Sequence, residues 1–143
     1  MPKSTTTSNS IVALIYNATP IANIADNAAS APTTNVYIAL ATASYTVAST
    51  MSSNETVYTN YVRQFAARTT AGWTAPASGA TSNVASIEFP QCGVTGATIT
   101  SACTGKATGA SNIFHYGDLN ASIAVSNLIQ PRFPIGAVTI TEA

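Results

Sequence analysis

Residues 35–42 read NVYIALAT, and this run of β-branched, aromatic and aliphatic side chains is the clearest strand signal in the chain. Similar strand-length runs occur further along, separated by clusters of Gly, Pro, Ser and Asn. They cover residues 57–68, 84–89, 97–102, 112–119, 121–125 and 137–141. Short strands at this spacing predict an all-β protein, a β-sandwich of the jelly-roll type, with fewer than about a fifth of its residues helical.

The residues before this β region have a different character. Residues 1–10 (MPKSTTTSNS) are polar and patternless, which is typical of a flexible arm. Residues 11–29 are apolar and are interrupted by Pro20, so we expect one or two short helical turns there. The chain is therefore expected to divide into an N-terminal arm with a short helical segment, residues 1–30, and a β-sandwich domain, residues 31–143.

The arm has two alternative places to bury its apolar side chains, among them Ile11, Leu14 and Ile15. A small sandwich is already filled by its own strands, so we expect the segment up to Ala29 to lie against another subunit. The alternative is that residues 11–29 cap the open end of their own sandwich as a helix.

Formal charge is unusually scarce. Lys, Arg, Asp and Glu make up 7% of the 143 residues, against roughly 25% in ordinary domains. Soluble monomers carry more surface charge than this, so either hydroxyl groups solvate the surface or partner chains cover it. We expect mainly the second, with a stable homodimer or homotrimer. The net charge is zero and no run of Lys or Arg occurs, which argues against a nucleic-acid partner and against a polybasic membrane contact.

The sequence contains no pattern of catalytic or metal-binding residues. His115 is the only histidine, the nucleophile-elbow pattern G-x-S-x-G is absent, and the five acidic residues are scattered. Cys92 and Cys103 fit no zinc-binding spacing; buried free thiols are the default expectation, and a disulfide between them is the alternative. We therefore expect a non-enzymatic protein with no cofactor and no bound metal.

Arginine and aromatic residues are enriched where proteins bind one another, and in a chain with so little charge each arginine is conspicuous. Trp73 and Phe133 lie in loops bounded by Pro and Gly, where a large ring either packs into its own core or meets a partner. Core packing is favoured for Trp73, and both alternatives stay open for Arg132 and Phe133. The candidate interface residues are Arg63, Arg68, Trp73, Arg132, Phe133, Ile11, Leu14 and Ile15.

Several segments resemble, in order, those of a family of small phage head proteins that often carry the automatic label of tail fibre protein. Residues 35–43 contain its first-strand pattern Val-Tyr-(Val/Ile)-(Ala/Gly)-Leu-x-Thr-Ala, and residues 73–83 its loop Trp-x-x-(Pro/Ala)-x-x-Gly-x-x-x-Asn. Residues 97–109 depart from the family, which has an aromatic-rich strand end there. Shorter matches are YVRQ at 61–64, IEFP at 87–90, YGDL at 116–119 and PIGAVTIT at 134–141.

The resemblance implies a jelly-roll capsid cement protein and names no catalytic residue. Such a protein is made in the cytoplasm of the host bacterium and binds the outside of the phage head. There it bridges neighbouring copies of the major capsid protein against the pressure of packaged DNA. The alternative function is a tail-fibre or receptor-binding module, for which Trp73 with Asn83 is the candidate carbohydrate site.

Overall fold

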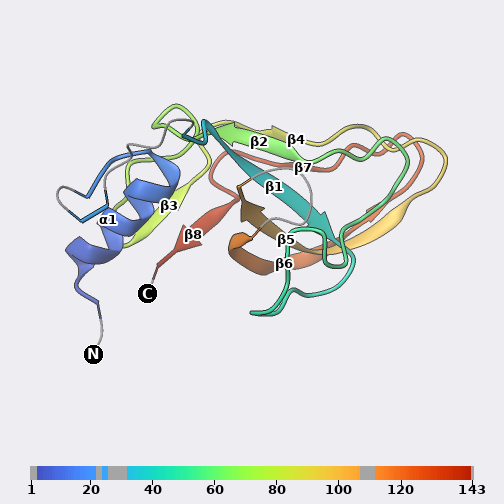
Figure 1. Cartoon of the computed structure of the whole chain (residues 1–143). Helices are drawn as coiled ribbons and strands as arrows, with labels where there is room; N and C mark the ends of the chain where they lie inside the picture. The colour runs from blue at the N-terminus through green and yellow to red at the C-terminus, as the bar shows by residue number, and fades with distance from the viewer. Residues whose placement is uncertain (1–2, 22–23, 26–31, 107–111, 143) are drawn as a thin grey trace. The chain divides into compact units, whose positions relative to one another are not determined.

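The computed structural model describes residues 3–21, 24–25, 32–106 and 112–142. Within these residues the chain forms one helix and eight strands (Figure 1). Their bounds are α1 Thr5–Tyr16, β1 Asn35–Ala41, β2 Gln64–Ala67, β3 Ala80–Ser82, β4 Ile87–Glu88, β5 Ala97–Gly105, β6 Ile113–Val125, β7 Arg132–Phe133 and β8 Thr139–Thr141. β2, β1, β5 and β6 form a four-stranded sheet in that order, while β3 with β8 and β4 with β7 form two-stranded sheets. The pairs β1–β5, β5–β6 and β3–β8 are antiparallel, and the predicted all-β class with a short N-terminal helical segment is confirmed.

The residues group into two compact units, each built from separate stretches of the chain. The first unit comprises Met1–Asn35, Ala66–Ser86 and Phe133–Ala143. The second unit comprises Val36–Phe65 and Ile87–Arg132. Each unit is described by itself below.

In the second unit, β1 forms where the clearest strand was predicted, and it is an interior strand of the four-stranded sheet. It is almost wholly buried, and because successive side chains of a strand point to opposite faces, both of its faces are covered by protein. Its buried residues are Val36, Ile38, Ala39, Leu40 and Ala41. β5 pairs with it in antiparallel register, from Tyr37 opposite Gly105 to Ala41 opposite Ser101.

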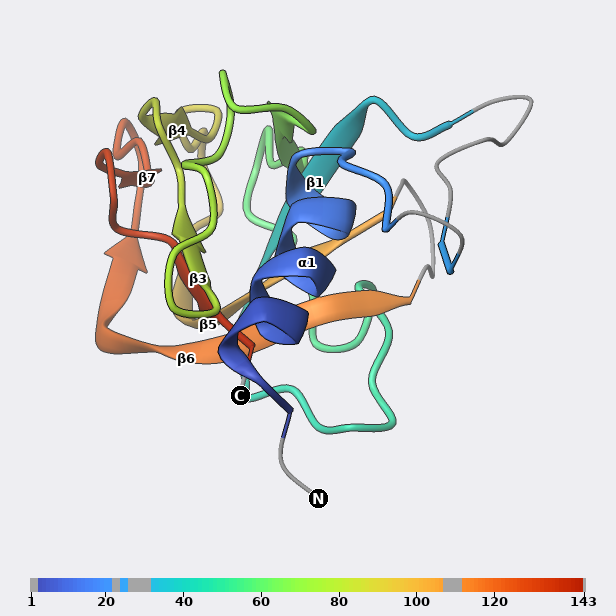
Figure 2. The same ribbon diagram turned by 90° about the vertical axis from the view of Figure 1, so that its left-hand side faces the viewer.

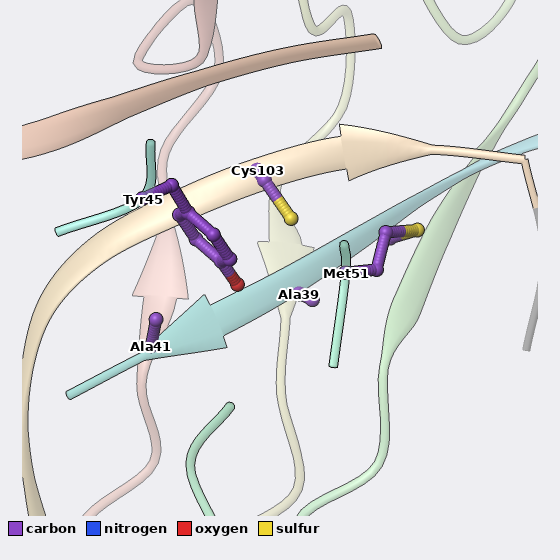
Figure 3. Close-up of a cluster of buried hydrophobic side chains, with 5 residues drawn as sticks. All are labelled: Ala39, Ala41, Tyr45, Met51 and Cys103. Carbon is purple, nitrogen blue, oxygen red and sulfur yellow. The ribbon is translucent and has the colours of Figure 1, made fainter. Parts of the chain in front are cut away.

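A small apolar cluster lies between β1, β5 and the loop that follows β1 (Figure 3). Its buried members are Ala39, Ala41, Tyr45, Met51 and Cys103. Gly105 permits this packing, because a Cβ at that position would lie 2.2 Å from the Met51 sulfur. Cys92 and Cys103 are both buried and free, as the default expectation had it.

β6 has 13 residues and is bent. Residues 123–125 pair with one end of β5, and residues 115–118 pair with Ser101–Thr104 in continuous register. Ile99 lies opposite Ile123, and Ser101 lies opposite Asp118. Thr100, the single residue between Ile99 and Ser101 on β5, therefore faces four residues of β6, 119–122. The strand turns at this irregularity (Figure 2). The strands predicted at 112–119 and 121–125 are therefore two arms of one strand.

In the first unit, helix α1 begins inside the segment predicted to be a flexible arm. The Ser4 hydroxyl accepts a hydrogen bond from the Thr7 amide at 3.2 Å and caps the first turn. Ser8, Val12 and Tyr16 follow at four-residue spacing and are the buried residues of the helix. Capping and this buried stripe offset the weak helix propensity of the Thr and Ser residues in the first turns.

The buried stripe of α1 packs against the helix's own chain. The Tyr16 ring meets Trp73 edge to face, with ring centroids 4.7 Å apart, and the Asn9 side chain accepts a hydrogen bond from the Gly79 amide. Gly79 has a φ of +76°, and a Cβ there would lie 2.7 Å from the Glu142 carbonyl oxygen, so only glycine fits. The described part of the N-terminal segment thus follows the alternative of packing on its own chain. Residues 22–23 and 26–29 lie outside the described residues.

Several boundaries in the β region differ from the sequence prediction, and two of the differences are instructive. Residues 57–68 predict one strand, but only β2 forms, because side-chain bonds of Tyr61 and Arg63 to Glu55 shape the residues before it. β3 lies in a stretch predicted to be a loop, and it pairs with β8 at the far end of the chain. Local sequence carries no signal for a three-residue strand whose partner is so distant.

Candidate functional site

The side chain of Arg63, one of the candidate interface residues, bonds to other residues of the second unit. Its Nε and Nη2 atoms each lie 2.7 Å from an oxygen of the Glu55 carboxylate, a bidentate ion pair. Nη2 also donates to the Ser52 hydroxyl at 2.9 Å. The hydrogen bonds to Glu55 raise the pKa of the Arg63 guanidinium, and only 9% of its side chain is exposed. Arg63 therefore ties the loop after β1 to the chain just before β2.

Tyr61 completes this arrangement. Its hydroxyl donates to Glu55 Oε1 at 3.0 Å and accepts a hydrogen bond from the Leu40 amide at 3.0 Å. Its ring packs edge to face on Tyr58 and stacks on Phe89. A shallow hollow of about 550 Å³ opens beside these groups. It is lined by Tyr37, Ser52, Glu55, Thr56, Val57, Tyr61, Val62 and Arg63.

We predict that the second unit loses stability in alkaline solution. Burial raises the pKa of Tyr58 to about 12 and raises the pKa values of Tyr45 and Tyr61 well above the ordinary 10.0. The folded protein therefore holds protons that the unfolded chain releases, so the stabilisation is complete below pH 10 and falls as pH rises above it.

A titration that follows tyrosinate absorbance together with circular dichroism tests this prediction. The late-ionising tyrosines should titrate together with loss of the β signal. Ionisation of all tyrosines near pH 10 in a protein that keeps its fold would contradict it.

The side chain of Arg68 bonds to residues of the first unit. Its Nε donates to the Ile15 carbonyl at 2.7 Å, Nη1 donates to the Thr33 carbonyl at 3.2 Å, and Nη2 donates to the Leu14 carbonyl. Two of these acceptors are in the last turn of α1, where carbonyl groups lack partners within the helix and where a positive charge is favourable. Partial burial lowers the pKa of Arg68. Arg68 thus caps the C-terminal end of α1.

Replacing Arg68 with alanine should lower the free energy of unfolding by about 2 kcal/mol, because hydrogen bonds to a charged donor are lost and helix-end carbonyls are left without it. Arg68→Lys should restore little of the loss, since an ammonium group cannot reproduce the guanidinium fork. Arg132→Ala, the same change of charge at an exposed position, is the control. Chemical denaturation of the three variants measures the difference; equal stability of the two alanine variants would contradict the capping role.

Trp73 belongs to the core of the first unit, as favoured from the sequence. It has no exposed surface, and Asn17 donates a side-chain hydrogen bond to its carbonyl oxygen at 3.2 Å. Asn83, which forms a bridge with Trp73, is 1% exposed. A carbohydrate must reach an aromatic face and polar side chains from solvent. The candidate carbohydrate site at Trp73 and Asn83 is therefore wrong.

Asn83 is a structural centre that the sequence analysis did not identify as one. Its Nδ2 donates to the carbonyls of Ala85 and Pro134, each at 2.8 Å, and its Oδ1 accepts from the Val138 amide at 2.9 Å. Its carbonyl accepts from the Gly136 amide at 3.0 Å. The family-like loop pattern of residues 73–83, which ends in Asn83, was the available signal, but an Asn in a loop usually indicates a turn at the surface.

The remaining candidates divide between surface and interior. Phe133 is buried, whereas Arg132 beside it is exposed. Ile11, Leu14 and Ile15 are half-buried on α1. Arg132 is therefore the one exposed residue among the eight candidates.

The sequence did not show which apolar side chains of the second unit are exposed, because these residues are scattered over loops and strands. Val57 is 87% exposed, and Val62 and Phe65 are each more than half exposed. Other exposed residues of this kind in the second unit are Val47, Val94, Tyr116, Leu128 and Ile129. On a surface with so few charges, they are natural contact points for a partner.

The described residues contain no group of three or more His, Cys, Asp and Glu side chains that could hold a metal ion. Among the same residues, no helix has the length and apolar character needed to cross a membrane.

A comparison with curated proteins found no match. A family model does match, over residues 5–141, and its description is podophage GP4 fiber I protein gp80. The match includes all the strands and the helix described above. It supports a bacteriophage structural protein, and it does not single out the capsid cement family. The chain belongs to the Gp80 family.

Proposed function

We propose that this protein is a structural part of a phage fibre that acts through contacts with other proteins and performs no catalysis. The observation that carries the proposal is the match of residues 5–141 to a family described as a fiber protein. Because the match spans nearly the whole chain, it concerns the entire fold and not one shared motif.

The placement of the polar side chains supports a passive role. Arg63 and Arg68 are engaged in bonds that stabilise the two units, and Asn83 joins loop segments. These contacts stabilise the fold itself. The surface supplies the contact points: it has few charges and carries exposed valine, leucine, isoleucine and aromatic side chains in the second unit. We expect the partners to be further copies of this chain and a neighbouring virion protein, with no nucleic acid and no membrane among them.

A cement protein on the head exterior, bound to the major capsid protein, is the second candidate, and the ordered family-like segments favour it. Two of those segments have structural explanations: β1 is an interior strand, and residues 73–83 contain the buried Trp73 and Asn83. Such features serve the fold at either location, so they do not distinguish head from fibre.

Gold-labelled antibodies against the recombinant protein, applied to intact phage particles, distinguish the two locations. We expect labels on the fibres. Labels over the head surface would overturn the proposal in favour of the cement function. Antibody pre-absorbed with the recombinant protein is the control. Binding of the recombinant protein to host cells or to purified heads gives an independent measurement.

A further inference from the structure

The outer edge of β6 is an open strand edge in the described part of the chain. β6 ends the order of the four-stranded sheet, so β5 is the one named strand that pairs with it, and outside the strand the preceding residue, Asn112, forms an isolated bridge with Thr50. The regular part of this edge is residues 115–118, which lie opposite Ser101–Thr104 without interruption. Register shifts bound this run at both ends, and the strand turns after it (Figure 2).

Hydrogen bonds show which backbone groups face outward. The Gly117 carbonyl accepts from the Ser101 hydroxyl at 2.9 Å, and the His115 carbonyl accepts from the Thr104 hydroxyl at 3.4 Å, so these carbonyls face β5. In an antiparallel strand the amide and carbonyl of one residue point to the same side, and the side alternates along the chain. The amide and carbonyl groups of Tyr116 and Asp118 therefore point away from β5, to the open edge.

This edge has little of the protection usual in monomeric proteins. Monomers cover edges with lysine, proline, very short strands or bulges. β6 contains no Pro, Lys or Arg, and Asp118 is its only carboxylate. Tyr116 is 45% exposed, and Gly117 and Asp118 are exposed. The bulges confine the open run to a few residues but leave the backbone groups within it accessible.

We propose that a second copy of this chain pairs with this edge, antiparallel, with the two-fold axis passing between the two Gly117 residues. Tyr116 of each copy then lies opposite Asp118 of the other, and their outward amide and carbonyl groups form two hydrogen-bonded pairs. The inference stands on the strand geometry and does not depend on where the protein sits on the virion.

Alternative registers are less favourable. A pairing centred on Asp118 sets two carboxylates directly opposite each other, which is destabilising. A pairing centred on Tyr116 needs Phe114, which lies at the register shift between Thr104 and Gly105. The register centred on Gly117 uses only the regular run. Its centre is a non-hydrogen-bonded position, where two strands approach closely, and a glycine there has no side chain to obstruct them.

So short a ladder gives a weak dimer in solution. Repetition in an assembly makes such contacts effective, since every copy already held nearby meets its neighbour at a high local concentration. The test must therefore capture a transient pair.

The variant Gly117→Cys can trap the transient dimer as a disulfide between the two copies. A Cβ at Gly117 has no atom within 4 Å, so a cysteine fits the folded chain. At a non-hydrogen-bonded position the two Cα atoms lie about 4.5 Å apart, within the range a disulfide spans. Ala121→Cys, exposed on the same strand beyond the run, is the matched control. The native Cys92 and Cys103 are buried.

Under mild oxidation, Gly117→Cys should form covalent dimers roughly tenfold faster than Ala121→Cys, because pairing raises the effective concentration of its thiols. In the unmodified protein, the amides of Tyr116 and Asp118 should become protected from hydrogen exchange as concentration rises. The amides of His115 and Gly117, which face β5, should be protected throughout. Equal cross-linking of the two cysteine variants, or exchange at Tyr116 and Asp118 that does not depend on concentration, would overturn the proposal.

Discussion

Replacing Trp73 with alanine should lower the free energy of unfolding of the first unit by about 3–5 kcal/mol, the usual cost of removing a buried aromatic side chain. Trp73 is fully buried, and its ring packs against Tyr16 of α1. The substitution leaves a cavity and removes the edge-to-face contact between Trp73 and Tyr16 of the helix. We therefore expect the helical circular dichroism signal to decrease well below the denaturant concentration that unfolds the parent protein.

The conservative variant Trp73→Phe separates packing from any other effect. Among the residues that the structure describes, the indole Nε1 has no hydrogen-bond partner, so phenylalanine removes no bond seen there and leaves only a smaller gap. Its loss of stability should be clearly less than that of Trp73→Ala. A Trp73→Ala protein that unfolds within about 1 kcal/mol of the parent would show that the ring contributes little to the core.

The variant Asn83→Ala should cost about 3 kcal/mol or more, although it removes only a small side chain. Three backbone groups lose a hydrogen bond: the carbonyls of Ala85 and Pro134 and the amide of Val138, of which the Pro134 carbonyl keeps a second bond from the Ala137 amide. Each hydrogen bond contributes about 1 kcal/mol to stability, and the buried Asn83 side chain makes three of them. Thermal or chemical denaturation measures the loss, and Asn120→Ala, at an exposed position of β6, is the control.

Asn83→Asp sharpens the test, because aspartate is nearly the same size as asparagine. It keeps the acceptor for Val138 but loses both donors and sets a negative charge against two carbonyl oxygens. It should be at least as damaging as the alanine variant. If Asn83→Asp keeps the stability of the parent, the hydrogen bonds of Asn83 do not determine the structure of this loop.

The interior of the sheet was predictable from local sequence. Residues 35–42 are apolar on both alternating faces, and β1 is buried on both. The free, buried state of Cys92 and Cys103 was the default expectation, because two cysteines make no disulfide framework and free cysteines are usually buried. In these cases one stretch of residues contained the whole signal.

The role of the arginines was not predictable in the same way. Arg63 and Arg68 look like contact residues in a chain with few charges, yet each bonds to groups distant in sequence: Glu55 in one case, the end of α1 in the other. The residue type indicates only that an arginine side chain needs several hydrogen-bond acceptors. It does not indicate whether these belong to the same chain or to a partner, because only the fold brings them together.

Helix α1 shows a further limit of prediction from local sequence. Its first turns consist of Thr and Ser, residues of modest helix propensity, so the sequence indicated an arm. The cap at Ser4 and the contact with Trp73 decide the outcome. The Trp73 contact is tertiary, and isolated segments of this length are rarely stable helices in water.

The assembly of the first unit from three distant stretches has a consequence for synthesis on the ribosome. Lys3 pairs with Glu142, and the Glu142 amide donates to the Gly79 carbonyl, so both ends of the chain and its middle meet in one place. Contacts this far apart in sequence form slowly, because a long loop must close before any of them is made. Nascent α1 leaves the ribosome before Trp73 and Gly79, which contact it, and long before Glu142, which pairs with Lys3 just ahead of the helix. The buried stripe of α1 is therefore uncovered until the later stretches of this unit are made, and during that interval premature association with other nascent chains competes with correct folding.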